Sequence, residues 1–571
     1  MEFSAIHHDM DKRYCFALSK GKFLIRVKTK KNDMSKVVLH YRDKYIPVRM
    51  IDTRKSVEMY VAATDRFNDY YEAVIDIDVI CLRYFFELTD TEGVTKYFGN
   101  YFYYDHILED NDRMFDCPQN LREEEIFNIP NWAKNKVVYQ IFPARFATDK
   151  LVPEEEWYKK PIGHMDDLKG NLRGIINHLD YIQDLGIEII YMTPIFKSPS
   201  SHKYNTEDYY EIDPAFGTKD DLRELVNKAH ERGIRVVLDA VFNHTGVDFW
   251  AFKDIVENGE KSQYKEWYYL EGFPLKMEFK QKPNFQTFAY FFGMPKLNLR
   301  NPETEQYFIN VGKYWIQEFG IDGWRLDVGD EVTHDFWKKF RQAIRQVKED
   351  ALIIGEIWHY AGDFLQGDEW DTVMNYQFYL SIIDFVVDEK ITASEFLGDL
   401  GFMRGNLHPE CYKTLLNLID SHDTARFKHI CKNNDKKHRL AAAIQLLTPG
   451  MPMIYYGDEL GMQGGPDPDC RRGMLWNEKK QNKETNSWYK AFINIRKQYP
   501  CITDGIIAKS FTDDNNGIII EHRKCDSEEL VIIIHGKDNQ VELPEYAGRT
   551  NLVNGKAFDG TIKAYEVAVL Q

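Results

Sequence analysis

The sequence predicts an α/β protein: a closed (β/α)8 barrel, preceded and followed along the chain by a β-sandwich. Three observations support this fold class. The middle of the chain alternates short apolar strands with helices, which is typical of a parallel sheet built from βα units. Both ends instead alternate apolar and polar residues in short runs, which is typical of antiparallel sheets. The chain has 571 residues, enough for several domains.

The N-terminal β-sandwich is predicted to span residues 1–121. Runs such as FLIRVKTK (23–30) and VVLHYRDKYIPVRM (37–50) read as strands, and the polar segments KKND and DTRK break them. The charged run Arg122–Glu125 and the segment up to Pro130 are interpreted as a solvated linker. The next domain is predicted to span residues 122–500.

Eight strands are predicted within this second domain, and their natural closure is a TIM barrel. The TVMNYQF strand has the least regular pattern of the eight. The predicted strands are VVYQIF (137–142), IEIIYMTPIF (187–196), IRVVLDAVF (234–242), DGWRLDV (322–328), ALIIGEIW (351–358), TVMNYQF (372–378), LLNLIDSHD (415–423) and MPMIYYGD (451–458).

Two helices between these strands carry clear end signals. Thr218 is a candidate N-cap with an acidic residue three positions on, and Gly233 is expected to stop that helix. Asn301 and Pro302 predict the start of a second helix, because a cap followed by proline in the first turn is a common helix start. Gly320 is expected to end it.

An inserted segment and a last domain complete the prediction. Residues from about 246 to 299 are rich in aromatics, glycine and proline and have no clear period, so we expect a functional insertion after the third strand. Residues 501–571 again show the pattern of β-hairpins, with the apolar runs GIIIEHR and LVIIIHG after the turn signal DDNNG. They are predicted to form a small C-terminal β-sandwich.

Composition excludes several classes of protein. The apolar fraction is 43%, the charged fraction 29% and the net charge -17, which argues against a nucleic-acid partner. The apolar runs fall short of the roughly 20 residues of a membrane span, and the N-terminus lacks a secretory pattern. The eight cysteines form no C-x-x-C pair, which argues against a zinc ribbon or redox motif. Scattered thiols fit a reducing cytoplasm.

Polar residues gather at the C-terminal ends of the predicted strands, where catalytic residues of such barrels lie. A single aspartate there could equally be a loop starter. Several carboxylates arriving together with arginine and histidine favour an active site. The residues concerned are Asp239, Asn243, His244, Arg325, Asp327, Glu356, His422 and Asp423.

Grouped carboxylates suit one particular chemistry. Carboxylates in one pocket shift one another's pKa values, so one can stay ionised as a nucleophile while another keeps its proton as a general acid. Glycoside hydrolysis with retention needs such a pair, about 5–5.5 Å apart. Arg325 is expected to hold Asp327 ionised and oriented.

The sequence resembles the α-amylase family of glycoside hydrolases. DAVFNH (239–244), GWRLDV (323–328), GEIW (355–358) and IDSHD (419–423) match its four conserved regions in order and spacing. MPKLN (294–298) is similar to a motif of the neopullulanase, cyclomaltodextrinase and maltogenic amylase group, and VVYQIFPARF and SHKYNTEDYYEIDPAFG look like that group too. The resemblance covers nearly the whole chain, including the N-terminal domain.

The resemblance implies a role for each matching catalytic residue. Asp327 would be the nucleophile, Glu356 the general acid and then the base, and Asp423 would bind sugar hydroxyls and steady the distorted ring. His244 and His422 would hydrogen-bond the sugar at the cleavage subsite.

Further substrate contacts are implied around these residues. Asp239 would support Arg325, and Tyr204 would stack on the sugar unless it is a core residue. Trp358 would contact the sugar on the leaving side. Asp467 and Arg471 would bind the next sugar on the other side, or form a surface salt bridge.

The sequence also departs from the group's pattern. Asn205 stands in place of an aspartate, and Gly329 and Asp330 replace alanine and asparagine, whereas Glu331 is kept. These changes leave the preferred linkage and acceptor open. The chemistry itself depends on residues that are all present.

The resemblance requires no cofactor and leaves calcium open. Some members bind calcium after the RFA motif, where Asp149 and Asp167 are the residues that could match. Asn243 matches a calcium ligand of typical α-amylases. Glu331 stands where those enzymes have a ligand histidine, so that second site is expected to be lost.

The resemblance finally implies partners and an activity. The N-terminal domain is expected to be carbohydrate-binding-like and to make a homodimer, with Tyr45 as a candidate for reaching a neighbour's cleft. The substrate would be an α-glucan: cyclodextrin, pullulan, maltooligosaccharide or starch. The alternatives are a glucan transferase or isomerase on the same fold, and a non-catalytic carbohydrate-binding homologue. The three catalytic carboxylates argue against the latter.

Overall fold

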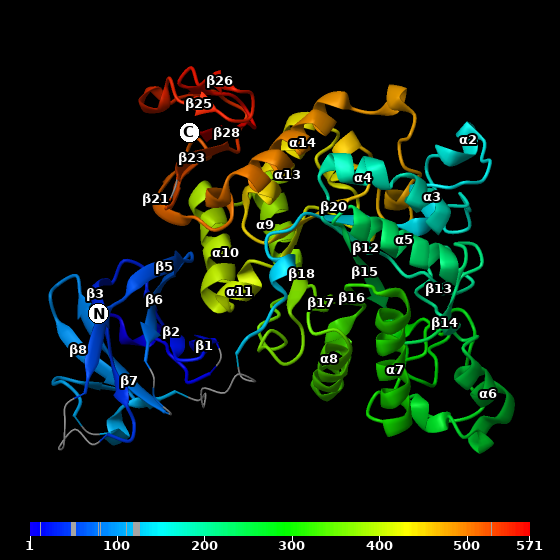
Figure 1. Cartoon of the computed structure of the whole chain (residues 1–571), viewed down its shortest axis with the longest axis horizontal. Coiled ribbons are helices and arrows are strands. Elements are labelled where there is room, and N and C mark those ends of the chain that lie inside the picture. Colours follow the sequence, from blue (N-terminus) through cyan, green and yellow to red (C-terminus); the bar gives the residue numbers. More distant parts are fainter. Residues whose placement is uncertain are drawn as a thin grey trace. The chain divides into compact units, whose positions relative to one another are not determined.

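The computed structural model describes residues 1–11, 13–46, 53–77, 79, 81–109, 111–117, 126–526 and 528–571. They form two compact units (Figure 1). The first comprises 1–129, 362–367 and 391–412, and the second comprises 130–361, 368–390 and 413–571. The run Arg122–Glu125, predicted to be a linker, and residues 47–50 of a predicted strand lie outside the described residues.

The first unit contains the predicted N-terminal sandwich of two antiparallel sheets. Alternate positions of β2, such as Phe23, Ile25 and Val27, are fully buried between the sheets, as the alternating pattern predicted. One sheet orders β1 (Cys15–Ser19), β2 (Lys22–Lys30), β6 (Asn68–Asp76) and β5 (Tyr60–Thr64). The other orders β4 (Lys55–Glu58), β3 (Met34–Asp43), β7 (Leu82–Asp90), β8 (Thr95–Gly99) and β9 (Phe102–Tyr104), with β10 (Phe115–Asp116) on β7.

Two helices from the middle of the chain also belong to this first unit. They are α10 (Ala393–Asn406) and α11 (Pro409–Tyr412). Helix α10 packs on β5, and Gly401 permits the approach because an added Cβ would lie 1.9 Å from the Thr64 carbonyl oxygen. Arg66 and Asp399 add an ion pair of 2.7 Å between the helix and the sandwich.

The second unit is built on a closed barrel of eight parallel strands, which confirms the predicted fold class. Every predicted strand is present, including the one with the least regular pattern. The strands are β11 (Val138–Ile141), β12 (Ile189–Met192), β15 (Arg235–Ala240), β16 (Gly323–Leu326), β17 (Leu352–Gly355), β18 (Thr372–Asn375), β19 (Leu416–Leu418) and β20 (Met451–Tyr455). Strands β20 and β11 pair and close the ring.

Helices follow the strands, and the predicted end signals are confirmed. Thr218 and Asp221 form a reciprocal capping box at the start of α5, and Gly233 follows its end with φ of 72°. Asn301 caps α7, and Gly320 ends it in the left-handed region. The helices are α1 (Pro143–Phe146), α2 (Glu154–Trp157), α3 (Leu172–Asn177), α4 (Leu179–Leu185), α5 (Lys219–Glu231), α7 (Pro302–Phe319), α8 (His334–Val347), α9 (Tyr376–Ile382), α12 (Phe427–Ile430), α13 (Asp435–Leu447) and α14 (Lys483–Gln498).

The segment predicted as an insertion after the third strand contains helix α6 (Trp250–Asn258) and irregular chain. Isolated bridges tie it together: Tyr268 pairs with Leu297, and His244 pairs with Lys296. The second bridge brings the MPKLN motif to the end of β15. A short hairpin of β13 (Phe196–Lys197) and β14 (Asp208–Ile212) precedes this region.

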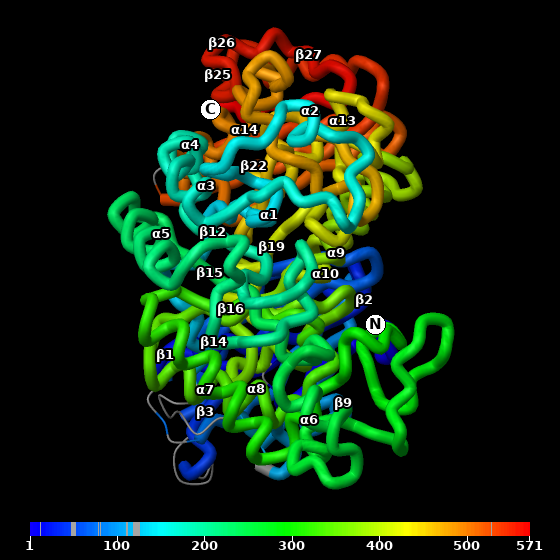
Figure 2. Tube along the Cα trace, turned by 90° about the vertical axis from the view of Figure 1, so that its right-hand side faces the viewer, coloured from blue at the N-terminus to red at the C-terminus, as the bar shows by residue number. Residues whose placement is uncertain are grey.

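The C-terminal sheets close over a core of their own. Ile520, Val531, Ile533 and Leu570 are buried in it, and the red strands β25 and β26 lie together in Figure 2. One sheet orders β21 (Ile506–Asp513), β22 (Ile518–Cys525), β23 (Glu528–His535), β28 (Val567–Leu570), β25 (Thr550–Asn551) and β26 (Lys556–Ala557). The other pairs β24 (Val541–Glu542) with β27 (Thr561–Ile562). None of the helices in the described part of the chain combines the length and apolar character that crossing a lipid bilayer requires.

Candidate active site

Two carboxylates stand side by side at the C-terminal ends of neighbouring strands. In the parallel register of β16 and β17, Leu326 is paired with Gly355, so Asp327 and Glu356 follow at the same level. Neighbouring strands lie about 4.8 Å apart, and their side chains one residue past the sheet therefore face one space. The Glu356 amide donates to the Leu326 carbonyl at 3.0 Å, so the hydrogen bonding between the two strands extends as far as Glu356.

One guanidinium joins these carboxylates. Arg325 is fully buried, and its Nη1 lies 2.9 Å from Asp327 Oδ1 while its Nη2 lies 2.8 Å from Glu356 Oε1. Nη1 also lies 3.1 Å from Asp239, which stands opposite Arg325 in the register of β15 and β16. Asp423 Oδ2 is 4.0 Å from Nη2. Four carboxyl groups therefore surround one positive charge.

That imbalance determines the electrostatics of the site. Burial raises the pKa of Asp327 well above its ordinary value, and Arg325 opposes the rise without cancelling it. Burial also raises the pKa of Asp239, and burial together with the charge of Glu356 raises the pKa of Asp423 to about 7. Arg325 thus favours the ionised form of Asp327, as expected, whereas burial favours the protonated form. Burial and mutual repulsion therefore favour the protonated forms of Asp239, Asp327 and Asp423, and Arg325 favours their ionised forms.

A strained turn after Asp327 orients Glu356. Val328 has φ of 47° in the left-handed region, which is costly for a β-branched residue. In this conformation its amide donates to Glu356 Oε2 at 2.9 Å. The next residue, Gly329, lies against Trp370, whose ring would be 2.8 Å from an added Cβ.

Trp358 and Tyr376 form the side of the site beyond Glu356. Their rings are stacked with centroids 3.8 Å apart and an angle of 11°. The Trp358 Nε1 lies 3.4 Å from Glu356 Oε1, and the Trp358 side chain is 47% exposed. Trp358 therefore offers an open aromatic face next to the carboxylate expected to act as the acid.

A hydrogen-bond chain connects the remaining polar residues. Gln140 Nε2 donates to His422 Nδ1 at 2.8 Å, so the proton of the neutral ring lies on Nε2. Burial, and then the neighbouring arginines, lower the pKa of His422 well below its ordinary value. Its Nε2 lies 3.2 Å from Asp423 and 2.5 Å from Tyr204 Oη. Tyr204 Oη also donates to Asp239 at 3.0 Å.

His244 is held from the inserted segment and the preceding loop. Its Nε2 lies 3.1 Å from the Tyr204 carbonyl oxygen, and its ring stacks on Phe288 at 5.4 Å. Burial lowers the pKa of His244 to about 3, so the ring is neutral. Neutral imidazoles can both donate and accept hydrogen bonds, which suits recognition of hydroxyl groups.

Arg471 joins the rim of the site to Asp423. The Arg471 side chain is buried, donates through Nε to the His422 carbonyl at 2.8 Å and lies 3.4 Å from Asp423 Oδ1. Its Nη1 pairs with Asp467 at 2.8 Å. The ion pair considered from sequence is present, and its arginine lies inside the site.

Comparison with known proteins gives the family of the chain. Residues 140–500 match the catalytic-domain model of α-amylase, and residues 1–119 match the model of the α-amylase N-terminal ig-like domain. The chain belongs to the α-amylase family.

Relatives within this family resemble the chain over nearly its full length. A cyclomaltodextrinase of Geobacillus thermopakistaniensis (strain MAS1) is 40% identical over 568 residues, covering 98% of this chain and 96% of the relative. Neopullulanase 2 of Thermoactinomyces vulgaris is 38% identical over 561 residues, covering 96% and 94%. A solved structure named cyclomaltodextrinase has a TM-score of 0.93 at 35% identity and covers 100% of both chains.

The two residues considered for calcium in this family member accept hydrogen bonds from the protein. Asp149 accepts a hydrogen bond from Asn171 at 2.7 Å, whereas Asp167 accepts one from the amide of Lys169 at 2.8 Å. Neither belongs to a group of three or more His, Cys, Asp or Glu side chains gathered within 4.8 Å in the described residues. A calcium ion takes six to eight oxygen ligands, so a site here would need carbonyl, amide or water oxygens besides these two carboxylates.

A lysine lies between the two residues compared with the other α-amylase calcium site. Lys296 Nζ is 2.5 Å from Asn243 Oδ1 and 3.0 Å from both Glu331 Oε2 and the Glu331 carbonyl oxygen. The ammonium thus joins the inserted segment to the ends of β15 and β16. Its positive charge occupies the oxygens that would otherwise be available to a bound cation.

Several functional positions in this α-amylase fold were not identified from sequence. Gln140 and Tyr191 are buried within apolar strands. Tyr191 donates to Asp239 at 2.6 Å. The presence of polar atoms inside an apolar strand was the one sequence signal for these two residues. No sequence signal marked Val328, because it acts through its backbone amide and not through its side chain. Lys296 was within a recognised motif, but its partners come from distant segments.

Proposed function

We propose that this protein is a retaining α-glucan hydrolase. It cleaves α-1,4-glucosidic bonds, and α-1,6 bonds to a lesser extent, in cyclodextrins, pullulan, maltooligosaccharides or starch. The observation that carries this proposal is the placement of Asp327 and Glu356 on neighbouring strands with one guanidinium between them. A retaining pair needs its two carboxyl groups about 5–5.5 Å apart, and binding to the two amino groups of one guanidinium holds this pair close together. The names of the relatives, which include cyclomaltodextrinase and neopullulanase, support the substrate class.

In the first step, Asp327 attacks the anomeric carbon of the bound glucose and forms a covalent glycosyl ester. Glu356 gives its proton to the departing glycosidic oxygen. In the second step, Glu356 takes a proton from water, whose oxygen breaks the ester and leaves Asp327 free. Two inversions at the same carbon give net retention.

The other site residues would bind and distort the sugar. Asp423 and His422 are suited to the hydroxyl groups of the glucose at the cleavage point, since both are polar and joined at 3.2 Å. His244 offers a further hydrogen bond, and Tyr204 presents its ring beside them. Trp358 would stack on the sugar of the leaving part, and the Asp467–Arg471 pair would bind on the opposite side.

Transfer of the glycosyl group to another sugar is a side activity of the same mechanism. A sugar hydroxyl can replace water in the second step, because Glu356 deprotonates either one. A dedicated transferase or isomerase would use the same residues. Product analysis separates the two, since a hydrolase releases mainly free reducing ends from maltotriose.

The test replaces the proposed nucleophile. Asp327→Asn is expected to lower the rate on maltotriose by at least about 10³-fold, because no covalent ester forms. Asp220→Asn is the matched control, since that aspartate is exposed on helix α5. Proton NMR of the first product should show the α-anomer. An Asn variant with most of its rate, or an initial β-anomer, would reject the mechanism.

We also propose a homodimer through the N-terminal domain. Tyr45 is 64% exposed and would contact the neighbouring chain. Light scattering should give twice the mass of 67.4 kDa, and Tyr45→Ala should weaken the association. A monomer at micromolar concentration would contradict it.

The proposal places the enzyme in the cytoplasm and requires no cofactor. A relative from Bacillus subtilis is named intracellular maltogenic amylase, which supports this location. Cell fractionation with an antibody checks it. Dialysis against a chelator should leave the hydrolysis rate unchanged, and a loss restored by calcium would show that the ion is needed.

A further inference from the structure

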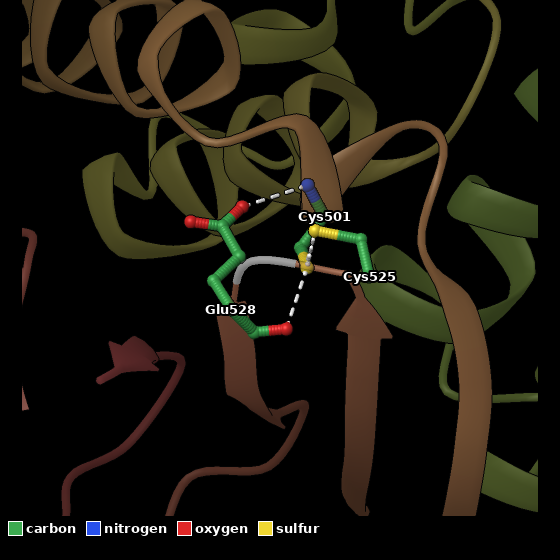
Figure 3. Close-up of side chains that lie close together, drawn as sticks. All are labelled: Cys501, Cys525 and Glu528. Atoms are coloured by element: carbon green, nitrogen blue, oxygen red, sulfur yellow. Dashed lines mark hydrogen bonds between the residues drawn. The ribbon is translucent and has the colours of Figure 1, made fainter.

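Three side chains of metal-ligand type meet where the last barrel helix leads into the C-terminal sheet. Cys501 lies in the turn η13 (Pro500–Ile502) after α14, Cys525 ends β22, and Glu528 begins β23. Figure 3 shows the three side chains close together. Within the part of the chain that the structure describes, they are the one group of three or more His, Cys, Asp or Glu whose ligand atoms all lie within 4.8 Å of one another.

The backbone fixes the positions of all three. Cys525 and Glu528 are directly paired in the antiparallel register of β22 and β23, which places their side chains on one face about 4.5–5.5 Å apart at Cβ. The Cys501 amide donates to Glu528 Oε1 at 2.9 Å, and its thiol donates to the Glu528 carbonyl oxygen at 3.2 Å. Two separate segments thus converge on one point. Ser527 lies outside the described residues.

The group combines two thiols with one carboxylate. Cys501 is fully buried, Cys525 is half-buried, and their sulfurs are 2.7 Å apart. In the described residues, no lysine or arginine makes an ion pair with Glu528; the contacts of its carboxylate are with Cys501. Two thiols and one carboxylate can together carry three negative charges, and a bound cation would neutralise most of them.

We propose that Cys501, Cys525 and Glu528 bind a divalent cation of the zinc class. Thiolates are soft ligands that favour zinc over magnesium or calcium. Zinc takes sulfur at about 2.3 Å and carboxylate oxygen at about 2.0–2.2 Å, and water completes the tetrahedron. Two sulfurs on a tetrahedral zinc are about 3.7 Å apart, so binding moves them about 1 Å from their present separation. Each thiol releases its proton to solvent.

Such a site would connect the barrel to the C-terminal sheet. Cys501 follows the last barrel helix directly, and the other two ligands belong to the first hairpin of that sheet. Binding to the folded state alone raises its stability. The expected consequence is structural, because the ligands come from a region of the chain that contributes nothing to the carboxylates at the barrel mouth.

The test uses the full-length protein, reduced with a phosphine and stripped of metal, with Co²⁺ as the probe. Wild type should bind one equivalent with thiolate-to-metal absorption, and Zn²⁺ should displace it. Cys501→Ser should raise the dissociation constant at least about 100-fold and Glu528→Gln about 10-fold. Cys15→Ser/Cys117→Ser is the matched control: it removes a thiol pair 3.3 Å apart in the first unit and should leave binding unchanged.

Three results would overturn the proposal. One is a wild-type protein without stoichiometric Co²⁺ binding. Another is an unchanged dissociation constant in both Cys501→Ser and Glu528→Gln. The third is a disulfide: oxidised glutathione would remove two thiols from the wild type but not from Cys501→Ser, and Zn²⁺ would give no protection. Glu528→Gln keeps an oxygen for the Cys501 amide, so it tests the site even where the serine variant fails to fold.

Discussion

Replacing Asp423 by asparagine is expected to stabilise the protein at alkaline pH while it removes most activity. Burial and the charge of Glu356 raise the pKa of Asp423 from 3.8 to about 7. A carboxyl group whose pKa is higher in the folded state binds more protons there than in the unfolded chain. The folded state therefore loses stability as the pH rises from about 4 to 7, because the buried group must ionise. Asparagine has no such cost.

The size of the effect follows from the pKa. A rise from 3.8 to about 7 corresponds to about 4 kcal/mol. The Asp423 side chain is 28% exposed, so solvent screens part of this cost, and about 2 kcal/mol is the expected gain above pH 7. Unfolding entropy is about 2.1 cal/mol/K per residue, so about 400 residues in the second unit give a Tm increase of about 2 °C.

Differential scanning calorimetry of wild type and Asp423→Asn at pH 5 and pH 8.5 measures this. The Tm difference should be larger at pH 8.5, and Asp220→Asn should show no such trend. The same samples should lose at least about 100-fold in rate on maltotriose, because a sugar contact that acts in the transition state is gone. An equal Tm difference at both pH values, or a less stable variant at pH 8.5, would refute the electrostatic reasoning.

Three further substitutions test other parts of the site. Lys296→Met should lower stability by about 1–3 kcal/mol, because Glu331 loses its cation; an unchanged Tm would contradict this. Gly355→Ala should lower kcat on maltotriose more than about 10-fold, since the new Cβ would lie 2.1 Å from Trp370 and displace the strand end; a normal rate would contradict it. Gln140→Leu should raise KM about 10-fold, because it frees the tautomer of the histidine it contacts; an unchanged KM would show that other contacts fix the ring.

The sequence predicted the fold well because its local signals agree with the global structure. The capping box at Thr218 and the proline and glycine at the two ends of α7 set helix limits that the structure reproduces. The eight apolar strands close as a barrel because each is buried on both faces. The association of α10 with the first unit could not be predicted from the sequence. Small residues such as Gly401 and Gly405 allow a close approach, but they do not indicate which segment approaches.

The catalytic carboxylates could be predicted because they stand at strand ends and within recognised motifs. The register of β16 and β17 then brings Asp327 and Glu356 together without further information. The protonation state could not be predicted, because it depends on how many carboxyls share one guanidinium. The thiol cluster at Cys501 was also missed, since its partner thiol is 24 positions away and no C-x-x-C spacing marks it.

The ammonium of Lys296 makes the contact between the inserted segment and the ends of β15 and β16 independent of any ion in solution. A free ion must be captured from solution, so the strength of an ion-held joint follows the ion's concentration and fails in a sequestering medium. A charge on a covalent tether cannot diffuse away, and its local concentration is fixed by the chain. The contact among Asn243, Lys296 and Glu331 therefore holds to the same degree in dilute buffer, in a calcium-poor medium or beside a competing ligand, and only unfolding or loss of the ammonium proton releases it.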